Sequence, residues 1–285
     1  MNTKTIDNAL LYYGINDEEY KIQCYNCLES VKHNTTLQKE FNDLFNVLFV
    51  DKTNKIKELW NIKSLNMLFS ETVHPYITNL LLLSGYEIHQ KNIDNYKLDE
   101  EQINIHKLRV KETLTNDIKT RNLDGIRISQ MLWGSYFINL RLIEVGRLQY
   151  EYENSNSIKI HIPADGKLNI DKVTNSLKKA DFFIKKYFKI ECYRYYCNSW
   201  LLSKQIHNIV DKNSNIYKFY ELFDVTEGES CVEDILNFVY KSSTKTYNEL
   251  QEETSLQMDI KKYLLNDNDI KLGKGILKKE YMKNE

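Results

Sequence analysis

The spacing of apolar residues divides the chain into two parts, and the first part has the period of an α-helix. Apolar side chains recur there at intervals of three and four, and Gly and Pro, which interrupt helices, are scarce. The clearest segment is 34–50, which offers Asn34 or Thr35 as an N-cap. Its apolar residues form one stripe that would face a core: Leu37, Phe41, Leu44, Phe45 and Leu48. The pattern predicts an all-helical domain over residues 1–125 and a second domain over 126–285.

In the second part the period changes to two, which indicates β-strands. Apolar and polar residues alternate in the sequences GRLQYEY and IKIHIP, and a turn-like stretch lies between them. Pairing Glu151 with Lys159, and therefore Gln149 with His161, puts every apolar residue on one face and every polar residue on the other. The pattern predicts an antiparallel hairpin in this register.

The rest of the second part alternates between helical and strand patterns. The expected elements are a helix over 170–188, a strand over 191–198, helices over 199–210 and 214–220, strands over 222–226 and 235–240, and a helix over 254–265 before a GKG turn. Such an order predicts an α/β (α+β) domain in which helices flank a mixed β-sheet.

Composition narrows the class of protein. A chain of 285 residues with 42% hydrophobic residues is long and apolar enough to bury a core. Its 39 Lys+Arg and 40 Asp+Glu leave a net charge of -1, so it lacks the broad cationic surface that binds nucleic acid without sequence preference. We expect no nucleic-acid partner. We also expect no membrane partner, because the most apolar segment is far too short to span a bilayer.

Cysteine usage and the amino terminus favour a cytoplasmic protein. The first residues lack a basic stretch followed by a long apolar core, and five cysteines is an odd number that fits free thiols in a reducing compartment. Cys24 and Cys27 form a CxxC, but no second pair follows at zinc-site spacing and His33 is the only nearby candidate ligand. We therefore expect buried helical cysteines there and no metal.

One short segment stands out against the composition. The chain has two Pro, three Ala and nine Gly, and Pro163–Gly166 contains one of each. The segment follows a predicted strand and precedes a predicted helix, where backbone N–H groups and the helix dipole favour phosphate. It is a candidate anion cradle. The alternative is an ordinary β-turn that needs Pro and Gly for its geometry.

The polar face of the predicted hairpin is a second candidate site. It would gather Arg147, Gln149, Glu151, Lys159 and His161, and a Glu or a His among them could act as a general base. Arg is rare in this Lys-rich chain, so a retained Arg147 suggests bidentate binding of an anion or a carboxylate. The alternative is a solvated outer face, which antiparallel sheets often have.

Cys197 supports a separate hypothesis. It lies in the sequence CNSW after a predicted strand, where it could present a nucleophilic thiol. The alternative is that Cys197 is a small buried hydrophobic residue, as strand cysteines usually are.

Several segments of the second part resemble a known bacterial family, the acyltransferase domain-containing proteins. Its members have a helical N-acyltransferase N-terminal domain and a GNAT-like C-terminal domain. The segments that carry the resemblance are VGRLQYE at 145–151, IHIPADGKL at 160–168, NSLKKADFF at 175–183, CNSWLL at 197–202, SNIYKFYELF at 214–223 and TSLQMDI at 254–260. The first part matches only in its helical character and length.

The resemblance implies a GNAT-like fold with acyl-CoA or acetyl-CoA as the donor. The acyl group would pass by direct attack to an amine of a small molecule or peptide. A central strand would hydrogen-bond the pantetheine, and the next loop and helix N-terminus would hold the diphosphate. The residues that correspond here are Ile160, Ile162, Pro163, Ala164, Asp165, Gly166 and Lys167. The glycine-rich loop usual in such folds is absent.

The resemblance also implies catalytic roles. Glu151, directly or through a water, is the expected base, His161 is the alternative base, and Tyr220 is the expected acid toward the leaving thiolate. We expect Arg147, Gln149 and Trp200 to contact the substrate.

Two other functions stay open. The altered phosphate loop would suit a catalytically inactive GNAT-like module that binds a ligand or another protein. A donor other than CoA, such as an acyl carrier protein, would need a basic patch beside the site, which Lys167, Lys178 and Lys179 could supply. The default role of such lysines is a solvated surface.

Overall fold

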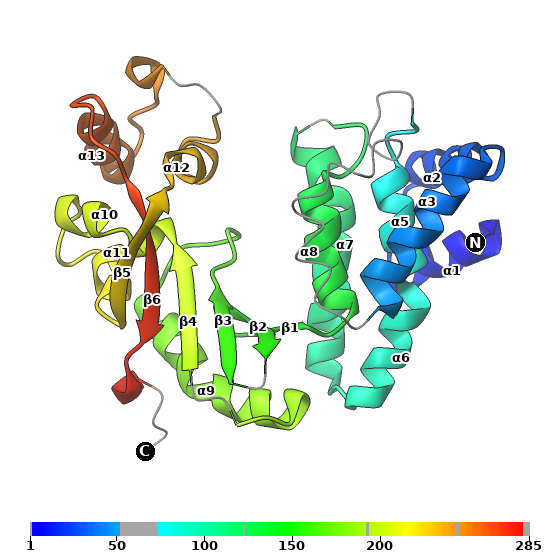
Figure 1. Cartoon of the computed structure of the whole chain (residues 1–285), viewed down its shortest axis with the longest axis horizontal. Coiled ribbons are helices and arrows are strands. Elements are labelled where there is room, and N and C mark those ends of the chain that lie inside the picture. The colour runs from blue at the N-terminus through cyan, green and yellow to red at the C-terminus, as the bar shows by residue number, and fades with distance from the viewer. Residues whose placement is uncertain are drawn as a thin grey trace. The chain divides into compact units, whose positions relative to one another are not determined.

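The computed structural model describes the chain as two compact units. Residues 2–51, 73–121, 123–154, 156–191, 194–242 and 246–281 are described. The units are Met1–Ile143 and Glu144–Glu285, and both appear in Figure 1.

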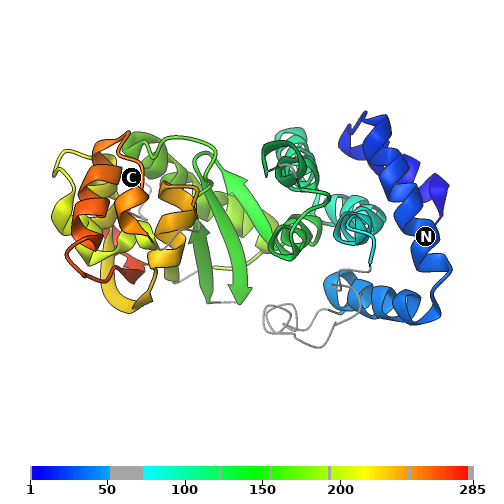
Figure 2. The ribbon, with the colours of Figure 1, turned by 90° about the horizontal axis from the view of Figure 1, so that it is seen from above.

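The first unit is helical, as predicted. Its described elements are α1 (Thr3–Tyr13), α2 (Glu18–Lys32), α3 (Thr35–Phe45), a π-helical turn (Asn46–Val50), α5 (Ile77–Ser84), α6 (Tyr86–Tyr96), α7 (Glu100–Arg121) and α8 (Ile128–Ile138). Asn34 is the N-cap of α3, where its side chain accepts the Leu37 N–H at 3.0 Å. α5 to α8 appear nearly end-on in Figure 2.

The core of this unit is built around α5, whose residues Ile77–Leu83 are all buried. A helix that is apolar on every side belongs inside a protein, and α5 packs against α1, α2, α3, α6 and α8. Its one buried amide, Asn79, donates to the Tyr20 hydroxyl and the Leu114 carbonyl and accepts the Ile126 N–H. These bonds satisfy the amide and tie three segments to the central helix.

The helical unit extends beyond the boundary predicted from the sequence. Met131, Leu132, Phe137 and Ile138 of α8 are buried in the core of the first unit. The contacts therefore divide the chain after Ile143 and not after residue 125.

The second unit contains a six-stranded mixed sheet flanked by helices, which confirms the predicted fold class. Its strands are β1 (Leu142–Val145), β2 (Leu148–Asn154), β3 (Ser157–His161), β4 (Arg194–Ser199), β5 (Phe223–Ser230) and β6 (Lys271–Leu277), in the order β1-β2-β3-β4-β6-β5. Its helices are α9 (Ile170–Phe188), α10 (Lys204–Ile209), α11 (Asn215–Tyr220), α12 (Val232–Val239) and α13 (Ser255–Leu264), with 3₁₀ turns at Trp200–Leu202, Tyr247–Glu249 and Lys279–Tyr281. β3 and β4 run parallel, whereas β2–β3, β4–β6 and β5–β6 are antiparallel.

The hairpin has the predicted register. Gln149 lies opposite His161 and Glu151 lies opposite Lys159. The apolar face of the hairpin packs against α9, where the Tyr150 hydroxyl lies 2.9 Å from the Ser176 hydroxyl. Ser176 in turn donates to the Val145 carbonyl, so Tyr150 is the donor to Ser176.

Two local predictions in the second unit are wrong. Residues 235–240 belong mostly to helix α12 and not to a strand, because Val232, Ile235, Leu236 and Val239 repeat at the helical period. The GKG sequence is not a turn but part of β6. A Cβ on Gly273 would lie 1.8 Å from the Leu202 carbonyl oxygen, so glycine is needed where the 3₁₀ turn crosses the strand.

Four cysteines of the described segments are free and buried: Cys24, Cys27, Cys197 and Cys231. Cys24 and Cys27 lie on α2 and are buried in the helical core, as predicted. The described part of the chain contains no helix with the length and apolarity to cross a bilayer.

Two buried histidines in the first unit are held by single hydrogen bonds. Both His89 and His106 are 0% exposed. His89 Nδ1 lies 3.1 Å from the Tyr13 hydroxyl, and His106 Nδ1 lies 3.3 Å from the Phe137 carbonyl. Burial lowers the pKa of His89 well below its usual value and that of His106 to about 4. Both side chains are therefore neutral at pH 7.

We predict that the first unit loses stability as the pH falls below the ordinary histidine pKa of about 6.5. The unfolded chain then binds protons that the folded chain cannot, so the stability present above pH 6.5 is lost between there and about pH 4. His106 alone accounts for a loss on the order of 3 kcal/mol. Urea unfolding at pH 7, 6 and 5 measures it, and His106→Gln, which cannot titrate, should flatten the pH dependence. An equally steep dependence in His106→Gln would contradict this assignment.

Candidate functional site

The polar face of the hairpin carries a buried pair of titratable groups. Glu151 on β2 and His161 on β3 are diagonal neighbours on this face, and His161 Nε2 lies 2.8 Å from Glu151 Oε2. Glu151 is 3% exposed, and the His161 side chain is 20% exposed. A fully solvated face, the alternative drawn from the sequence, is therefore wrong for this part of the hairpin.

The hydrogen bond determines which nitrogen of His161 is basic. A carboxylate only accepts, so the hydrogen on Nε2 is donated to Glu151 and the lone pair is on Nδ1. Burial lowers the pKa of His161, and the bond to Glu151 opposes that shift. The arrangement provides a neutral imidazole that is oriented by a carboxylate, which is a common design for a general base.

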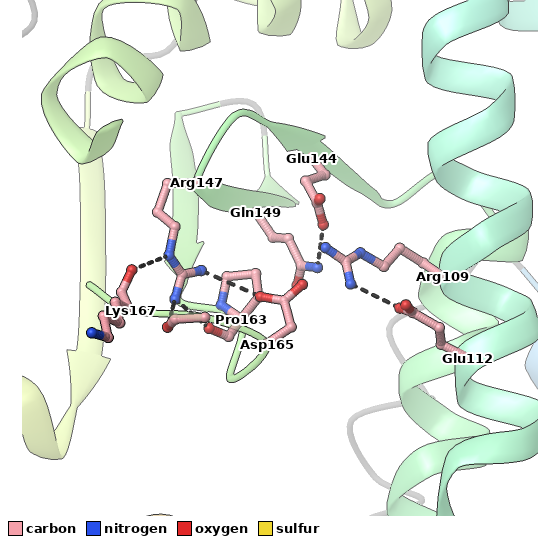
Figure 3. Close-up of polar contacts among 9 residues, drawn as sticks. Arg109, Glu112, Glu144, Arg147, Gln149, Pro163, Asp165 and Lys167 are labelled. Carbon is pink, nitrogen blue, oxygen red and sulfur yellow. Dashed lines mark hydrogen bonds and ion pairs between the residues drawn. The ribbon is translucent and has the colours of Figure 1, made fainter. Parts of the chain in front are cut away.

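A second buried pair lies beside it. Gln149 Nε2 donates to Glu144 Oε2 at 2.7 Å, and both side chains are buried (Figure 3). Glu144 is not among the site residues predicted from the sequence. Its signal was present, because it is the one acidic residue in the otherwise apolar strand Leu142–Val145. The Gln149 amide is thus held by the protein, and its contact with a substrate stays a prediction.

Arg147 holds the Pro163–Gly166 loop in place. Its Nη2 donates to the carbonyls of Pro163 and Gly166 at 2.7 Å each, and its Nε donates to the Lys167 carbonyl at 3.1 Å. Its Nη1 lies 3.6 Å from Asp165 Oδ1, and Figure 3 shows the loop turned toward the guanidinium. Arg147 therefore organises the loop and offsets the charge of Asp165.

The loop itself is open to solvent. Ala164, Asp165, Gly166 and Lys167 are exposed, and a Cβ added to Gly166 would meet no described atom within 4 Å. Gly166 also lacks the positive φ that favours glycine. Neither packing nor backbone conformation therefore requires glycine at position 166. Close approach of a ligand to the backbone is a physical reason for a glycine there.

The helix that follows the loop begins with part of its amide groups already satisfied. Asn169, the N-cap of α9, accepts the Lys172 N–H at 2.9 Å, and Asn215 accepts the Ile170 N–H at 3.3 Å. Asp171 places a negative charge in the first turn. An anion here would depend on the loop amides as well as on the helix terminus.

The two parallel strands of the sheet separate beside this site. β3 pairs with β4 only from Ser157 to Lys159 in the described residues. Beyond that point Ile160 and His161 pair with β2, whereas Cys197 and the residues after it pair with β6. In the described residues the β3–β4 ladder therefore ends at Lys159, and the end of β3 from Ile160 onward is outside it.

Two predicted residues lie in other surroundings. Tyr220 stacks on His207, which lies 4.1 Å from the ring centroids of both Tyr220 and Tyr217. Burial raises the pKa of Tyr220, so its phenol keeps its proton. Trp200 packs against the apolar core formed by α10, α12 and α13. Within the described segments, no hydrogen bond or ring contact joins either side chain to the hairpin.

The nucleophile hypothesis for Cys197 is contradicted by its surroundings. The side chain is 1% exposed, and burial raises the pKa of its thiol to about 12. A thiol that stays protonated and buried is a poor nucleophile.

The part of the chain that the structure describes contains no group of side chains suited to bind a metal ion. No three His, Cys, Asp or Glu side chains gather there in a way that could hold an ion.

The sequence of the second unit matches a known family. Residues 142–277 match the family described as the GNAT-like C-terminal domain. No curated protein matches the chain.

Solved structures share the fold. One is described as an acyltransferase in complex with decanoyl-CoA, with a TM-score of 0.64 and 19% identity over 72% of this chain and 66% of that chain. Another is an acyltransferase in complex with decanoyl-CoA and teicoplanin, with a TM-score of 0.64 and 18% identity over the same shares of the two chains. The match thus spans slightly less than two thirds of those proteins, and at this identity it establishes the fold.

We predict that Arg147→Lys loosens the loop. Lysine keeps the charge, but its single ammonium nitrogen cannot reproduce the planar fork by which Nε and Nη2 of Arg147 reach carbonyls at separate positions. Folding stability should therefore fall by about 1–3 kcal/mol. Amide exchange of residues 164–169 should accelerate, and hydrogen–deuterium exchange measures it. Lys167→Ala is the matched control, because Lys167 contributes only its backbone carbonyl to Arg147. Unchanged exchange in Arg147→Lys would show that the loop is held by other contacts.

Proposed function

We propose that this chain, whose residues 142–277 belong to the GNAT-like C-terminal domain family, is an acyltransferase that uses a CoA thioester. The acyl group passes to an amine of a small molecule or peptide by direct attack. The observation that carries the proposal is the separation of β3 from β4 next to the Glu151–His161 pair. It places strand backbone that lies outside the β3–β4 ladder and a candidate base side by side on one strand.

The separated strand suits the pantetheine arm of CoA. That arm contains two amides in an extended chain, so it can hydrogen-bond to Ile160–Pro163 in the way an added strand does. The exposed loop at Gly166 and the start of α9 then receive the diphosphate. Lys167 and Lys172 add positive charge there, and the Arg147 guanidinium offsets Asp165.

His161 is the proposed base. Its Nδ1 takes the proton of the amine as nitrogen attacks the thioester carbonyl, and the Glu151 carboxylate stabilises the imidazolium that forms. The carbon–sulfur bond then breaks and the thiolate of CoA leaves. Tyr220 stays the candidate acid for that thiolate, as the family resemblance implies, and its ring is stacked on His207.

The solved neighbours support a CoA thioester as the donor. Their descriptions name decanoyl-CoA, octanoyl-CoA and CoA as bound molecules, and teicoplanin as a further partner. For this chain we infer an acyl-CoA donor and an acceptor that carries an amine.

We predict that Gly166→Ala weakens CoA binding without changing stability. The added methyl group meets no described protein atom, so the free energy of unfolding should stay within about 0.5 kcal/mol of the wild type. It does intrude where the diphosphate approaches the backbone, and calorimetry with CoA should show a Kd raised about tenfold. An unchanged Kd would place the diphosphate elsewhere.

We predict that His161→Gln lowers kcat by about 10²- to 10⁴-fold and leaves the Kd of CoA unchanged, because proton removal and not binding is lost. Glu151→Gln, which keeps an acceptor but loses the charge, should lower kcat less. Release of the CoA thiol from acetyl-CoA and decanoyl-CoA, measured over a panel of amines, reports the rates.

Cys197→Ser is the control for the His161 and Glu151 variants and should retain the wild-type rate. Wild-type kcat in His161→Gln would remove the base from the mechanism. Failure of the wild-type chain to bind any CoA at millimolar concentration would instead favour the inactive module. The missing glycine-rich loop and the two carboxylates of Asp165 and Asp171 are the features that suit such a module.

A further inference from the structure

The outward face of α9 is cationic and carries one exposed aromatic ring. Six residues repeat on this face at helical spacing: Lys178, Lys179, Phe182, Lys185, Lys186 and Lys189. The opposite face of α9, with Val173, Leu177, Ala180, Ile184 and Tyr187, is buried against the sheet. We refer to the six residues as the α9 lysine face.

Phe182 is the unusual member of this face. Its side chain is 60% exposed, and the Lys186 ammonium lies 6.0 Å from its ring centroid. A single exposed apolar residue is ordinary on a protein surface. An aromatic ring among five lysines differs, because it sets an apolar anchor within charge of one sign, which is complementary to an acidic partner.

The charge of this segment contrasts with that of the whole chain. Residues 167–189 contain seven lysines and two aspartates, although the full sequence has a net charge of -1. Lys185 is paired with Asp181 at 2.9 Å. Lys178 and Lys179 are both exposed. Such a local excess attracts and orients an acidic partner.

The α9 lysine face lies on the helix that begins at the proposed donor site. α9 begins directly after the loop that we assign to the diphosphate, and Phe182 lies roughly 18 Å further along the helix axis. An extended phosphopantetheine arm has a comparable length. A protein that covers this face and extends to the start of α9 could therefore place its phosphate at the loop and its thioester in the gap between β3 and β4.

We propose that the α9 lysine face docks an acidic acyl carrier protein, which presents its acyl group on phosphopantetheine. This inference rests on the proposed function, since both donors would use the same strand and the same base. In the reaction the carbon–sulfur bond of the carrier thioester breaks and the amide carbon–nitrogen bond forms. The proton lost by the amine ends on the carrier thiol, so no further reactant is needed.

The test measures binding, because the acceptor amine is known only by class. Fluorescence anisotropy of a labelled acidic acyl carrier protein, loaded with a decanoyl chain, is followed against the full-length chain at about 0.1 M salt. Lys178→Glu combined with Lys179→Glu should weaken carrier binding at least about tenfold. It should leave decanoyl-CoA binding within about twofold, because these side chains lie away from the loop.

Two further variants make the test specific. Phe182→Ala should also weaken carrier binding by about tenfold while leaving the unfolding midpoint unchanged, since the ring is mostly exposed. Lys204→Glu combined with Lys212→Glu changes the net charge of the same unit by the same amount at exposed positions elsewhere. This matched control should bind the carrier as the wild type does.

The possible results separate the two proposals. Decanoyl-CoA binding without carrier binding overturns the carrier inference and leaves the proposed function intact. Absence of both overturns both. Binding to phosphatidylglycerol vesicles that is lost in the lysine variants, or a dimer that Phe182→Ala dissociates, also overturns the inference if the carrier does not bind. Carrier binding that is equal in the wild type and the α9 variants removes this face from the interaction.

Discussion

The register of the β2–β3 hairpin is the constraint on which the candidate site depends. Because side chains alternate along a strand, one register places Tyr150 toward α9 and Glu151 together with His161 on the opposite face. A shift by one residue would put the buried carboxylate into the apolar core and the tyrosine on the polar face. The hairpin therefore holds the helix and builds the acid–imidazole pair through the same set of backbone bonds.

The surroundings of this pair show how a chain poor in glycine and rich in lysine can organise a loop for an anion. One arginine holds the loop, because the planar guanidinium of Arg147 contacts three backbone carbonyls and the Asp165 carboxylate at once. With its carbonyls turned toward Arg147, the loop leaves an open glycine and exposed backbone to solvent. Beside it, the end of β3 lies outside the β3–β4 ladder in the described residues.

Buried polar groups in the two units have different kinds of hydrogen-bond partner. In the helical unit Asn79 and the two histidines tie helices together, and their hydrogen bonds run mostly to backbone carbonyls, backbone N–H groups and tyrosine hydroxyls. On the polar face of the hairpin the buried groups pair side chain with side chain, as in Gln149 with Glu144 and His161 with Glu151. Of these two pairs, only His161 with Glu151 contains a group that can take up a proton near neutral pH, which is a property of sites that handle protons.

The amino-acid sequence by itself determined the elements whose pattern is local. The helical first unit, the N-cap at Asn34, the limits of α9 and the hairpin register all follow from spacings within a few residues, because helix and strand periods act at that range. A short apolar run fits a helix and a strand equally well, so the pattern predicts a strand over 235–240 where the chain forms helix α12. The glycines of GKG lie in a strand because the turn at Leu202, far away in the sequence, packs against it. Only the tertiary structure decided that β4 leaves β3, that Arg147 holds the loop and that Cys197 is buried, since each depends on segments far apart in the chain whose packing has no local signature.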